Sequence, residues 1–169
     1  IDNIIDLADG IMVARGDLGV EVDFYKVPLI QKELVDKCIA ISKPVIIATQ
    51  MMESMITNFR PTRAEANDVA NAVIDGADTV MLSGETSVGK YPVEVIECMH
   101  DIIQCTEEKV YRYNRGLPPS EFSKTFTVDS LCYTASQLAT QSKASAIILF
   151  THSGRSVYQI AAQRPNAKI

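Results

Sequence analysis

The chain has 169 residues, a length that accommodates one ordinary domain or two small ones. Hydrophobic residues make up 47% and charged residues 22%, a soluble globular composition that excludes a disordered tail, a collagen-like repeat and a coiled coil. The net charge of −5 gives no indication of nucleic-acid binding. Residues 1–113 carry 10 basic and 19 acidic side chains, whereas residues 114–169 carry 6 and 2, so we expect two units with different partners.

The cysteines and the two ends of the chain indicate the cellular compartment of the protein and its relation to a longer chain. None of the cysteines forms a C-x-x-C pair, and we interpret all four as buried, reduced thiols of a cytoplasmic protein: Cys38, Cys98, Cys105 and Cys132. No apolar run is long enough to cross a bilayer, and we expect no membrane association. The chain starts without methionine or signal-peptide pattern and stops where an apolar strand is expected to begin. We therefore expect a piece of a longer protein.

In chain order, the first pattern is a helical spacing of apolar residues that ends at Asp9-Gly10. Four short apolar runs predict strands buried on both faces of a parallel sheet, at residues 11–14, 45–48, 80–82 and 146–150. Helical patterns occupy residues 26–42, 62–75, 92–111, 127–141 and 154–162. Thr62 and Glu65 form a capping-box pattern, Gly76 is expected to end that helix, and Pro92 opens the next one.

The spacing of the strands predicts βαβ units. Ile11, Val45 and Val80 lie 34 and 35 residues apart, and residues 8–13 resemble residues 77–82. Units of this size suit a (β/α)₈ barrel, but three of them cannot close one. The sheet is therefore either open or the last part of a barrel. A Pro-, Gly- and Ser-containing linker follows at residues 114–126, and residues 127–169 predict the start of a second α/β unit.

Polar residues follow each of the first three strands, where parallel βα proteins carry their functional groups: residues 15–19, 49–54 and 83–86. Asp17 either binds Mg²⁺ or caps a short helix. Thr49 either binds a phosphate or carboxylate group of a ligand, or its hydroxyl satisfies the hydrogen-bonding groups at the end of the strand. Glu85 is more typical of a helix-capping acid than of a general base. Arg63 sits where a helix dipole disfavours a cation, a weak indication of a partner anion. We interpret three methionines as packing residues: Met51, Met52 and Met55.

A second candidate site follows the fourth predicted strand. Small hydroxyl residues, a glycine and an arginine precede a helix there: Thr151, His152, Ser153, Gly154, Arg155 and Ser156. Backbone N–H groups, the helix dipole and the Arg155 guanidinium all favour an anion such as phosphate. The alternative is an ordinary serine-capped helix. No Ser-His-acid or Cys-His arrangement is evident, so hydrolysis by a triad is not expected.

Several long motifs together resemble pyruvate kinase, in that family's order and spacing: residues 11–19, 43–51, 60–65 and 81–86. The loop at residues 151–156 then matches the family's C-terminal domain. The resemblance covers essentially the whole chain. It implies the last three βα units of a TIM-type (β/α)₈ catalytic barrel in residues 1–113, followed by a linker and by the start of a C-terminal α/β regulatory domain.

The resemblance also implies an activity and site residues. It implies transfer of a phosphoryl group from phosphoenolpyruvate to ADP, giving pyruvate and ATP. Asp17 would be one of two carboxylates that hold Mg²⁺ or Mn²⁺, and Thr49 would contact phosphoenolpyruvate. The backbone of Ala14, Arg15 and Gly16 would line the substrate carboxylate site. Arg63 would lie near a subunit interface, and residues 151–156 would bind the phosphate of an allosteric effector.

The resemblance places other parts of the family's machinery before Ile1: the catalytic lysine, the second Mg²⁺ carboxylate and the K⁺ ligands. We therefore expect no catalytic residue within residues 1–169 and no activity of this chain by itself. A homotetramer is implied for the parent protein. At His152 many members of the family have lysine, which leaves the effector open. The alternative function is a stand-alone phosphate-binding or interaction module.

Overall fold

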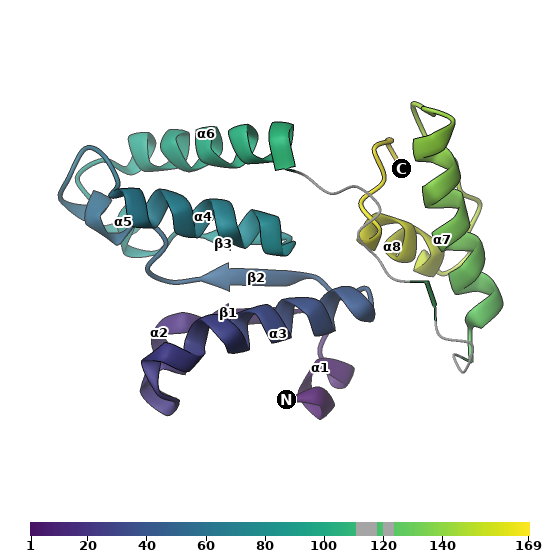
Figure 1. The fold of residues 1–169 in the computed structure, drawn as a ribbon, viewed down its shortest axis with the longest axis horizontal. Helices are drawn as coiled ribbons and strands as arrows, with labels where there is room; N and C mark the ends of the chain where they lie inside the picture. The colour runs from purple at the N-terminus through teal and green to yellow at the C-terminus, as the bar shows by residue number, and fades with distance from the viewer. Residues whose placement is uncertain (111–117, 120–123) are drawn as a thin grey trace. The chain divides into compact units, whose positions relative to one another are not determined.

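The computed structural model describes residues 1–110, 118–119 and 124–169 of the chain (Figure 1). The chain divides into two compact units. One comprises Ile1–Cys38 and Pro44–Tyr111, and the other comprises Ile39–Lys43 and Arg112–Ile169. The predicted linker at residues 114–126 lies largely outside the described residues, as does the predicted helix end at Tyr111.

Within the described residues, the first unit holds one sheet of three parallel strands in the order β1-β2-β3. The strands are β1 at Ile11–Ala14, β2 at Val45–Ala48 and β3 at Thr79–Met81. The first two strands confirm the prediction, whereas the third begins and ends one residue earlier than predicted. The reason is the register: Ile46 pairs with Thr79, and Ala48, the last residue of β2, pairs with Met81. Leu82 therefore has no opposite residue in β2.

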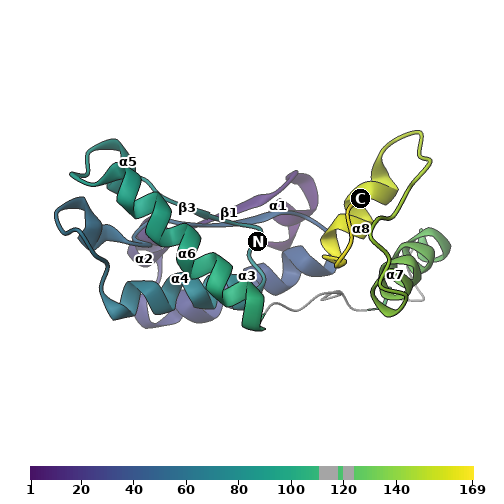
Figure 2. The same ribbon diagram turned by 90° about the horizontal axis from the view of Figure 1, so that it is seen from above.

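Helices alternate with these strands, which makes the first unit an α/β fold as predicted. They are α1 at Asp2–Leu7, α2 at Arg15–Glu21, α3 at Val27–Ala40, α4 at Arg63–Asp75, α5 at Gly84–Ser87 and α6 at Pro92–Val110, with 3₁₀ turns η1 at Phe24–Lys26 and η2 at Glu53–Ile56. Figure 2 shows α3, α4 and α6 on the same side of the sheet.

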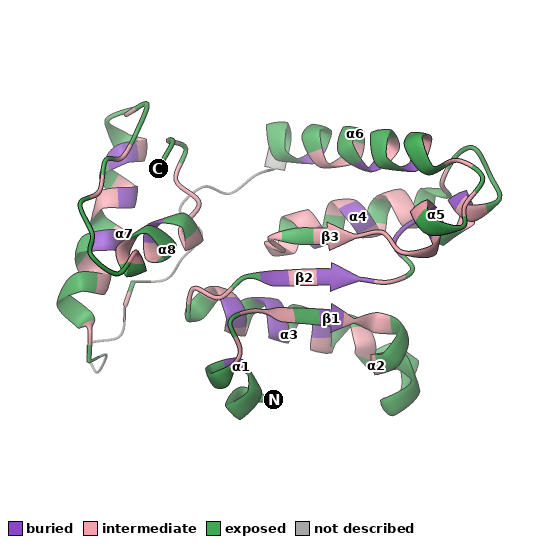
Figure 3. Cartoon of the chain, turned by 180° about the vertical axis from the view of Figure 1, so that it is seen from behind, coloured by how far each residue is buried: buried purple, intermediate pink, exposed green. Residues whose placement is uncertain are grey.

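The core of the first unit lies between the sheet and this helix layer (Figure 3). Its large side chains with less than 2% exposure are apolar and come from β2, the loop after it, and the inner faces of three helices: Val35, Cys38, Val45, Ile47, Met51, Met52, Met55, Val69 and Val95. The interpretation of the three methionines as packing residues is therefore confirmed. The expectation that all four cysteines are buried is wrong in part, because Cys98 is only half-buried and Cys105 is exposed. That residue lies outside the buried stripe of α6 formed by Val95, Met99 and Thr106.

Helix α4 begins and ends where its sequence predicts. The Thr62 hydroxyl accepts a hydrogen bond from the Glu65 N–H, and the Glu65 carboxylate accepts one from the Thr62 N–H, which completes the capping box. Gly76 ends the helix with a φ of 100°, in the left-handed region that glycine adopts without strain. Local chemistry alone therefore fixes both ends of this helix.

The second unit contains α7 at Phe126–Gln141 and α8 at Arg155–Ala162, which contact each other. Both helices were predicted. The strand predicted at residues 146–150 is wrong. Within the described part of the chain, its only ladder contact is an isolated parallel bridge between Ala146 and Lys168. A buried strand needs partners along its length, and here Ile148 is 82% and Phe150 99% exposed.

Candidate functional site

The carboxyl ends of β1, β2 and β3 lie at one edge of the sheet, because the strands are parallel and adjacent. Each strand leads into a polar segment there: α2 after β1, the turn from Thr49 to Met52 and η2 after β2, and α5 after β3. The predicted residues Ala14, Arg15, Gly16, Asp17 and Thr49 therefore share this edge. We refer to it below as the strand-end site.

A direct contact joins the first two of these segments. The Gly16 N–H donates a hydrogen bond of 2.9 Å to the Thr49 hydroxyl oxygen. Thr49 and the following Gln50 have φ values of 71° and 53°. The left-handed region costs energy for any residue but glycine, most of all for a β-branched one, so other contacts must hold this turn.

The Arg15 side chain supplies some of those contacts. Its guanidinium donates to the Thr49 carbonyl at 2.7 Å and 3.2 Å and to the Gln50 carbonyl at 3.2 Å. It also forms a two-pronged ion pair with Asp68 of α4, at 2.6 Å and 2.8 Å, and the Arg15 side chain is only 13% exposed. The guanidinium is thus occupied by hydrogen bonds to other groups of this chain. A substrate at this edge would therefore contact the backbone of Arg15 rather than its side chain. Sequence reasoning missed Asp68, which is 53 residues away and carries no local signal.

Asp17 lies in the first turn of α2 and is exposed. Its carboxylate makes no hydrogen bond or ion pair with any described residue. The capping interpretation does not hold, because Ala14 is the N-cap and no side chain caps α2. A carboxylate that is free and exposed beside the strand-end site suits Mg²⁺, which binds through one or two carboxylates plus substrate oxygens and water.

Among the residues that the structure describes, no ready-made cluster of ligands surrounds Asp17. No group of three or more His, Cys, Asp or Glu side chains among the described residues is placed to hold a metal ion. A metal bound at Asp17 would therefore take its remaining ligands from substrate, water or other parts of the protein. The donor set fits a substrate-bridged Mg²⁺ and does not fit a preformed metal cage.

Glu85 occupies the second position of α5 and is 2% exposed. One of its oxygens accepts a hydrogen bond of 2.8 Å from the Ser83 N–H, at the start of α5. The other accepts one of 3.2 Å from the Met52 N–H, in the turn after β2. The interpretation as a helix-cap acid accounts for the first bond, whereas the second is a tertiary contact that the sequence did not indicate.

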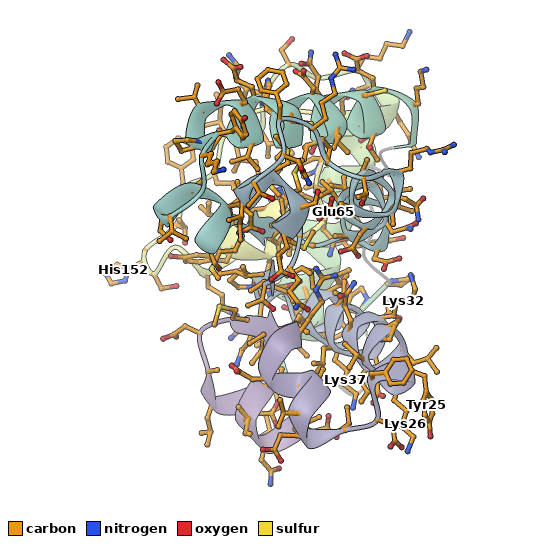
Figure 4. All side chains as sticks on the ribbon, turned by 90° about the vertical axis from the view of Figure 1, so that its left-hand side faces the viewer. Tyr25, Lys26, Lys32, Lys37, Glu65 and His152 are labelled. Atoms are coloured by element: carbon orange, nitrogen blue, oxygen red, sulfur yellow. The ribbon has the colours of Figure 1, made fainter. Side chains whose placement is uncertain are left out.

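Glu65, labelled in Figure 4, belongs to the capping box of α4 and links this helix to η2. Its carboxylate accepts hydrogen bonds from the Ser54 N–H at 2.7 Å and the Ser54 hydroxyl at 2.5 Å, in addition to those from Thr62. Partial burial raises the pKa of Glu65, but the hydrogen bonds from Ser54 and Thr62 outweigh it, so the pKa lies below its ordinary value. The loop after β2 is therefore tied to α4 by a charged group.

Arg63 is the first residue of α4 and is exposed, and its guanidinium has no partner among the described residues. A cation in the first turn of a helix gains nothing from the helix dipole. That placement is consistent with a partner outside this chain, and the predicted interface role of Arg63 stays a prediction.

The candidate phosphate loop belongs to the second unit. Gly154, with a φ of 78°, is the N-cap of α8, and no side chain caps that helix in the usual way. The Gly154 N–H donates to the Thr151 hydroxyl at 3.1 Å, and the Arg155 N–H reaches the Ser153 hydroxyl at 3.4 Å. His152 projects into solvent (Figure 4). The loop is thus an exposed turn whose hydroxyl groups already contact its own amides.

The Arg155 guanidinium donates to the Thr125 hydroxyl, just before α7, at 3.0 Å. Arg155 is nevertheless exposed, so part of the guanidinium faces solvent beside the loop. Ser156, the last predicted residue of the loop, lies in the first turn of α8. The six predicted residues therefore form one continuous surface segment, and its ligand stays a prediction.

The fold and the strand-end site define a class: α/β proteins built from parallel βα units that carry polar groups at the carboxyl edge of the sheet. None of the described helices has the length and hydrophobicity to cross a membrane. Residues 1–96 match the family model described as pyruvate kinase, barrel domain. That match covers more than half of the chain, which therefore belongs to the pyruvate kinase family.

Curated relatives agree along the whole chain. The chain is 48% identical over 169 residues to a pyruvate kinase of Geobacillus stearothermophilus, covering 100% of the chain and 29% of that protein. It is 46% identical over 170 residues to one of Clostridium acetobutylicum and 47% identical over 173 residues to one of Leishmania mexicana, again covering 100% of the chain. The chain spans 36% and 34% of the lengths of these two relatives.

Proposed function

We propose that this chain is a segment of a pyruvate kinase, an enzyme that transfers the phosphoryl group of phosphoenolpyruvate to ADP to give pyruvate and ATP. The observation that carries the proposal is the strand-end site in a chain of this family. There the exposed Asp17 carboxylate lies one residue from Gly16, whose N–H contacts the Thr49 hydroxyl. A free carboxylate, a hydroxyl and backbone amides at one edge suit an anionic substrate bridged to a metal ion.

The proposed roles follow from the chemistry of these groups. The backbone around Ala14, Arg15 and Gly16 positions the carboxylate of phosphoenolpyruvate, and the Thr49 hydroxyl contacts that substrate. Asp17 holds Mg²⁺ or Mn²⁺, and the bound ion supplies neutralisation of negative charge during phosphoryl transfer. After transfer, the enolate of pyruvate takes up a proton. The cation that faces the transferred phosphoryl group and the K⁺ ligands come from residues before Ile1.

The finer architecture belongs to the same proposal. Residues 1–113 form the last three βα units of a (β/α)₈ barrel, residues 114–126 a linker, and residues 127–169 the start of a C-terminal regulatory domain. In the complete protein, a cytoplasmic homotetramer, Arg63 lies near a subunit interface and residues 151–156 bind the phosphate of an effector. The chain by itself is inactive. A stand-alone binding module is not favoured, because the family match lies in the catalytic barrel.

The test compares two aspartate variants in the complete protein, using a coupled assay with phosphoenolpyruvate, ADP, Mg²⁺ and K⁺. Asp17→Ala removes the proposed metal ligand, so we expect kcat to fall by about 100-fold or more, since a metal contributes several kcal/mol to the transition state. Asp9→Ala removes an exposed aspartate outside the strand-end site and should leave kcat within about twofold. Normal turnover by Asp17→Ala at saturating Mg²⁺ would refute the role of Asp17, and an inactive wild-type enzyme would refute the function.

A further inference from the structure

Among the residues that the structure describes, Glu85 is the one buried carboxylate, at 2% exposure. It forms no ion pair with a described residue, and its two oxygens accept hydrogen bonds only from the N–H groups of Met52 and Ser83. Burying a carboxylate without a cation is unfavourable unless hydrogen bonds compensate. A neutral side chain would avoid that cost, so the two amide contacts are what the carboxylate contributes.

These two contacts join neighbouring turns. Ala48 and Met81 form the last pair between β2 and β3. Met52 lies four residues beyond Ala48, and Ser83 lies two beyond Met81. The Glu85 carboxylate therefore continues the link between the two strands past the point where their backbone ladder ends.

The surroundings of Glu85 hold it in place. A Cβ atom on Gly89 would lie 2.1 Å from the Glu85 carbonyl oxygen, so the chain after α5 packs directly on the backbone of Glu85. The Lys90 N–H donates to the Ile56 carbonyl at 2.9 Å, a second link between the segments after β3 and β2. Glu85 is thus held in place by its surroundings, and the turn after β2 is hydrogen-bonded to it through the Met52 N–H.

That turn is strained and carries Thr49. Two consecutive residues with positive φ, Thr49 and Gln50, persist only if the surrounding structure holds them. From the β1 side, the Arg15 guanidinium holds the carbonyls of these two residues. From the β3 side, the attachment is the Glu85 contact to Met52, three residues after Thr49.

We propose that Glu85 is a positioning residue of the strand-end site: its carboxylate ties the turn after β2 to the turn after β3, and so keeps the Thr49 hydroxyl in contact with the Gly16 amide. The consequence for catalysis rests on the function proposed above, whereas the tie itself is a property of the fold. Loss of the tie displaces Thr49, and displacing a substrate-contacting group lowers the rate of reaction of that substrate.

The experiment uses the complete protein with two variants. Glu85→Gln keeps the shape of the side chain, but its NH₂ group faces one of the two backbone donors, so one hydrogen bond is lost. Glu97→Gln is the control, because Glu97 is exposed on α6, outside the strand-end site, and has no partner among the described residues. Hydrogen–deuterium exchange of peptides covering residues 49–56 and steady-state kinetics with both substrates are measured.

For Glu85→Gln we expect exchange within residues 49–56 to rise about tenfold or more and kcat/KM for phosphoenolpyruvate to fall about tenfold, with the KM for ADP within twofold of wild type. Glu97→Gln should match wild type in each measurement. Unchanged exchange in Glu85→Gln overturns the proposal. So do faster exchange with normal phosphoenolpyruvate kinetics, and KM values that rise equally for phosphoenolpyruvate and ADP, which would indicate a merely structural role.

Two further results are decisive. If Glu85→Gln does not fold, Glu85→Asp replaces it: the shorter side chain keeps its charge and the nearby Ser83 amide but cannot reach Met52, so the same results are expected. If wild type shows no turnover of phosphoenolpyruvate, the proposed function fails, and exchange alone decides whether Glu85 ties the two turns.

Discussion

Thr49 combines a β-branched side chain with a φ of 71°, a conformation that costs of order 1–3 kcal/mol. Such strain is maintained only where neighbouring groups over-determine the backbone, and it is concentrated at functional sites. Here Arg15 and Glu85 hold the turn from two sides. The strained conformation brings the Thr49 hydroxyl to the Gly16 amide, which no extended continuation of β2 would do.

Thr49→Val tests the hydroxyl itself. The substitution keeps the shape of the side chain and removes the acceptor for the Gly16 N–H, so we expect kcat/KM for phosphoenolpyruvate to fall about tenfold in the complete enzyme. The melting temperature should change by only a few degrees. Thr57→Val, at an exposed threonine of the same loop, is the control. If kcat/KM is unchanged in Thr49→Val, the hydroxyl serves only to satisfy the strand end.

At the scale of elements, Glu65 connects α4 to η2 through one carboxylate that accepts hydrogen bonds from Ser54 and Thr62. The capping box was predictable from residues 62–65, because it is local. The bonds to Ser54, 11 residues earlier, were not. Glu65 thereby fixes where the long loop after β2 ends.

Glu65→Ala should lower the free energy of unfolding by about 1–2 kcal/mol at pH 7, since it removes half of a capping box and the bonds to Ser54. The folded-state pKa of Glu65 lies below its ordinary value of 4.5. Its stabilising contribution is therefore present above pH 4.5 and is lost as the pH falls through the folded-state pKa. Urea denaturation at pH 7 and at lower pH measures this difference. Glu97→Ala, on the exposed face of α6, is the control, and an equal loss at both pH values would contradict the assignment.

Two glycine substitutions test how helix ends are specified. Gly76→Ala places a Cβ at a φ of 100°, so we expect a loss of about 1–2 kcal/mol. Gly19→Ala lies inside α2, where the new Cβ would come within 4.0 Å of the Val27 side chain, an ordinary van der Waals contact, so we expect a neutral or slightly stabilising effect. Thermal denaturation of both variants gives the comparison. Similar changes in melting temperature would show that the left-handed cap of α4 contributes nothing.

At the scale of the whole molecule, the two units carry different chemistry. The first places the free Asp17 carboxylate at the edge of its sheet, and the second exposes the hydroxyl groups of Thr151 and Ser153 before α8 and the Arg155 side chain at its first position. The charges differ in the same way: acidic residues are in excess in residues 1–113, and basic residues are in excess in residues 114–169.

Ser153→Glu tests the proposed effector site. It adds a negative charge to the exposed loop where a phosphate would bind, so calorimetric titration of the complete protein with sugar phosphates should show at least about tenfold weaker binding. Gln141→Glu adds the same charge at the exposed end of α7 and should bind like wild type. Equal affinity in all three proteins, or no binding by wild type to any sugar phosphate, would reject the site.

The sequence alone predicted features whose cause is local or periodic. Short apolar runs located β1 and β2, a capping box and a left-handed glycine fixed α4, and Pro92 opened α6. The residues after each strand marked the strand-end site, because parallel strands bring their carboxyl ends to one edge. The same reasoning failed for residues 146–150, since an apolar run forms a strand only if partners are there to pair with it.

Only the tertiary structure decided how the site is held together. The ion pair between Arg15 and Asp68 and the contact between Glu85 and Met52 join residues 53 and 33 positions apart. Such contacts depend on how helices and strands pack against one another. Neither composition nor periodicity indicates which charged group will contact which backbone atom. The left-handed turn at Thr49 has the same origin, because local preference opposes it and long-range hydrogen bonds enforce it.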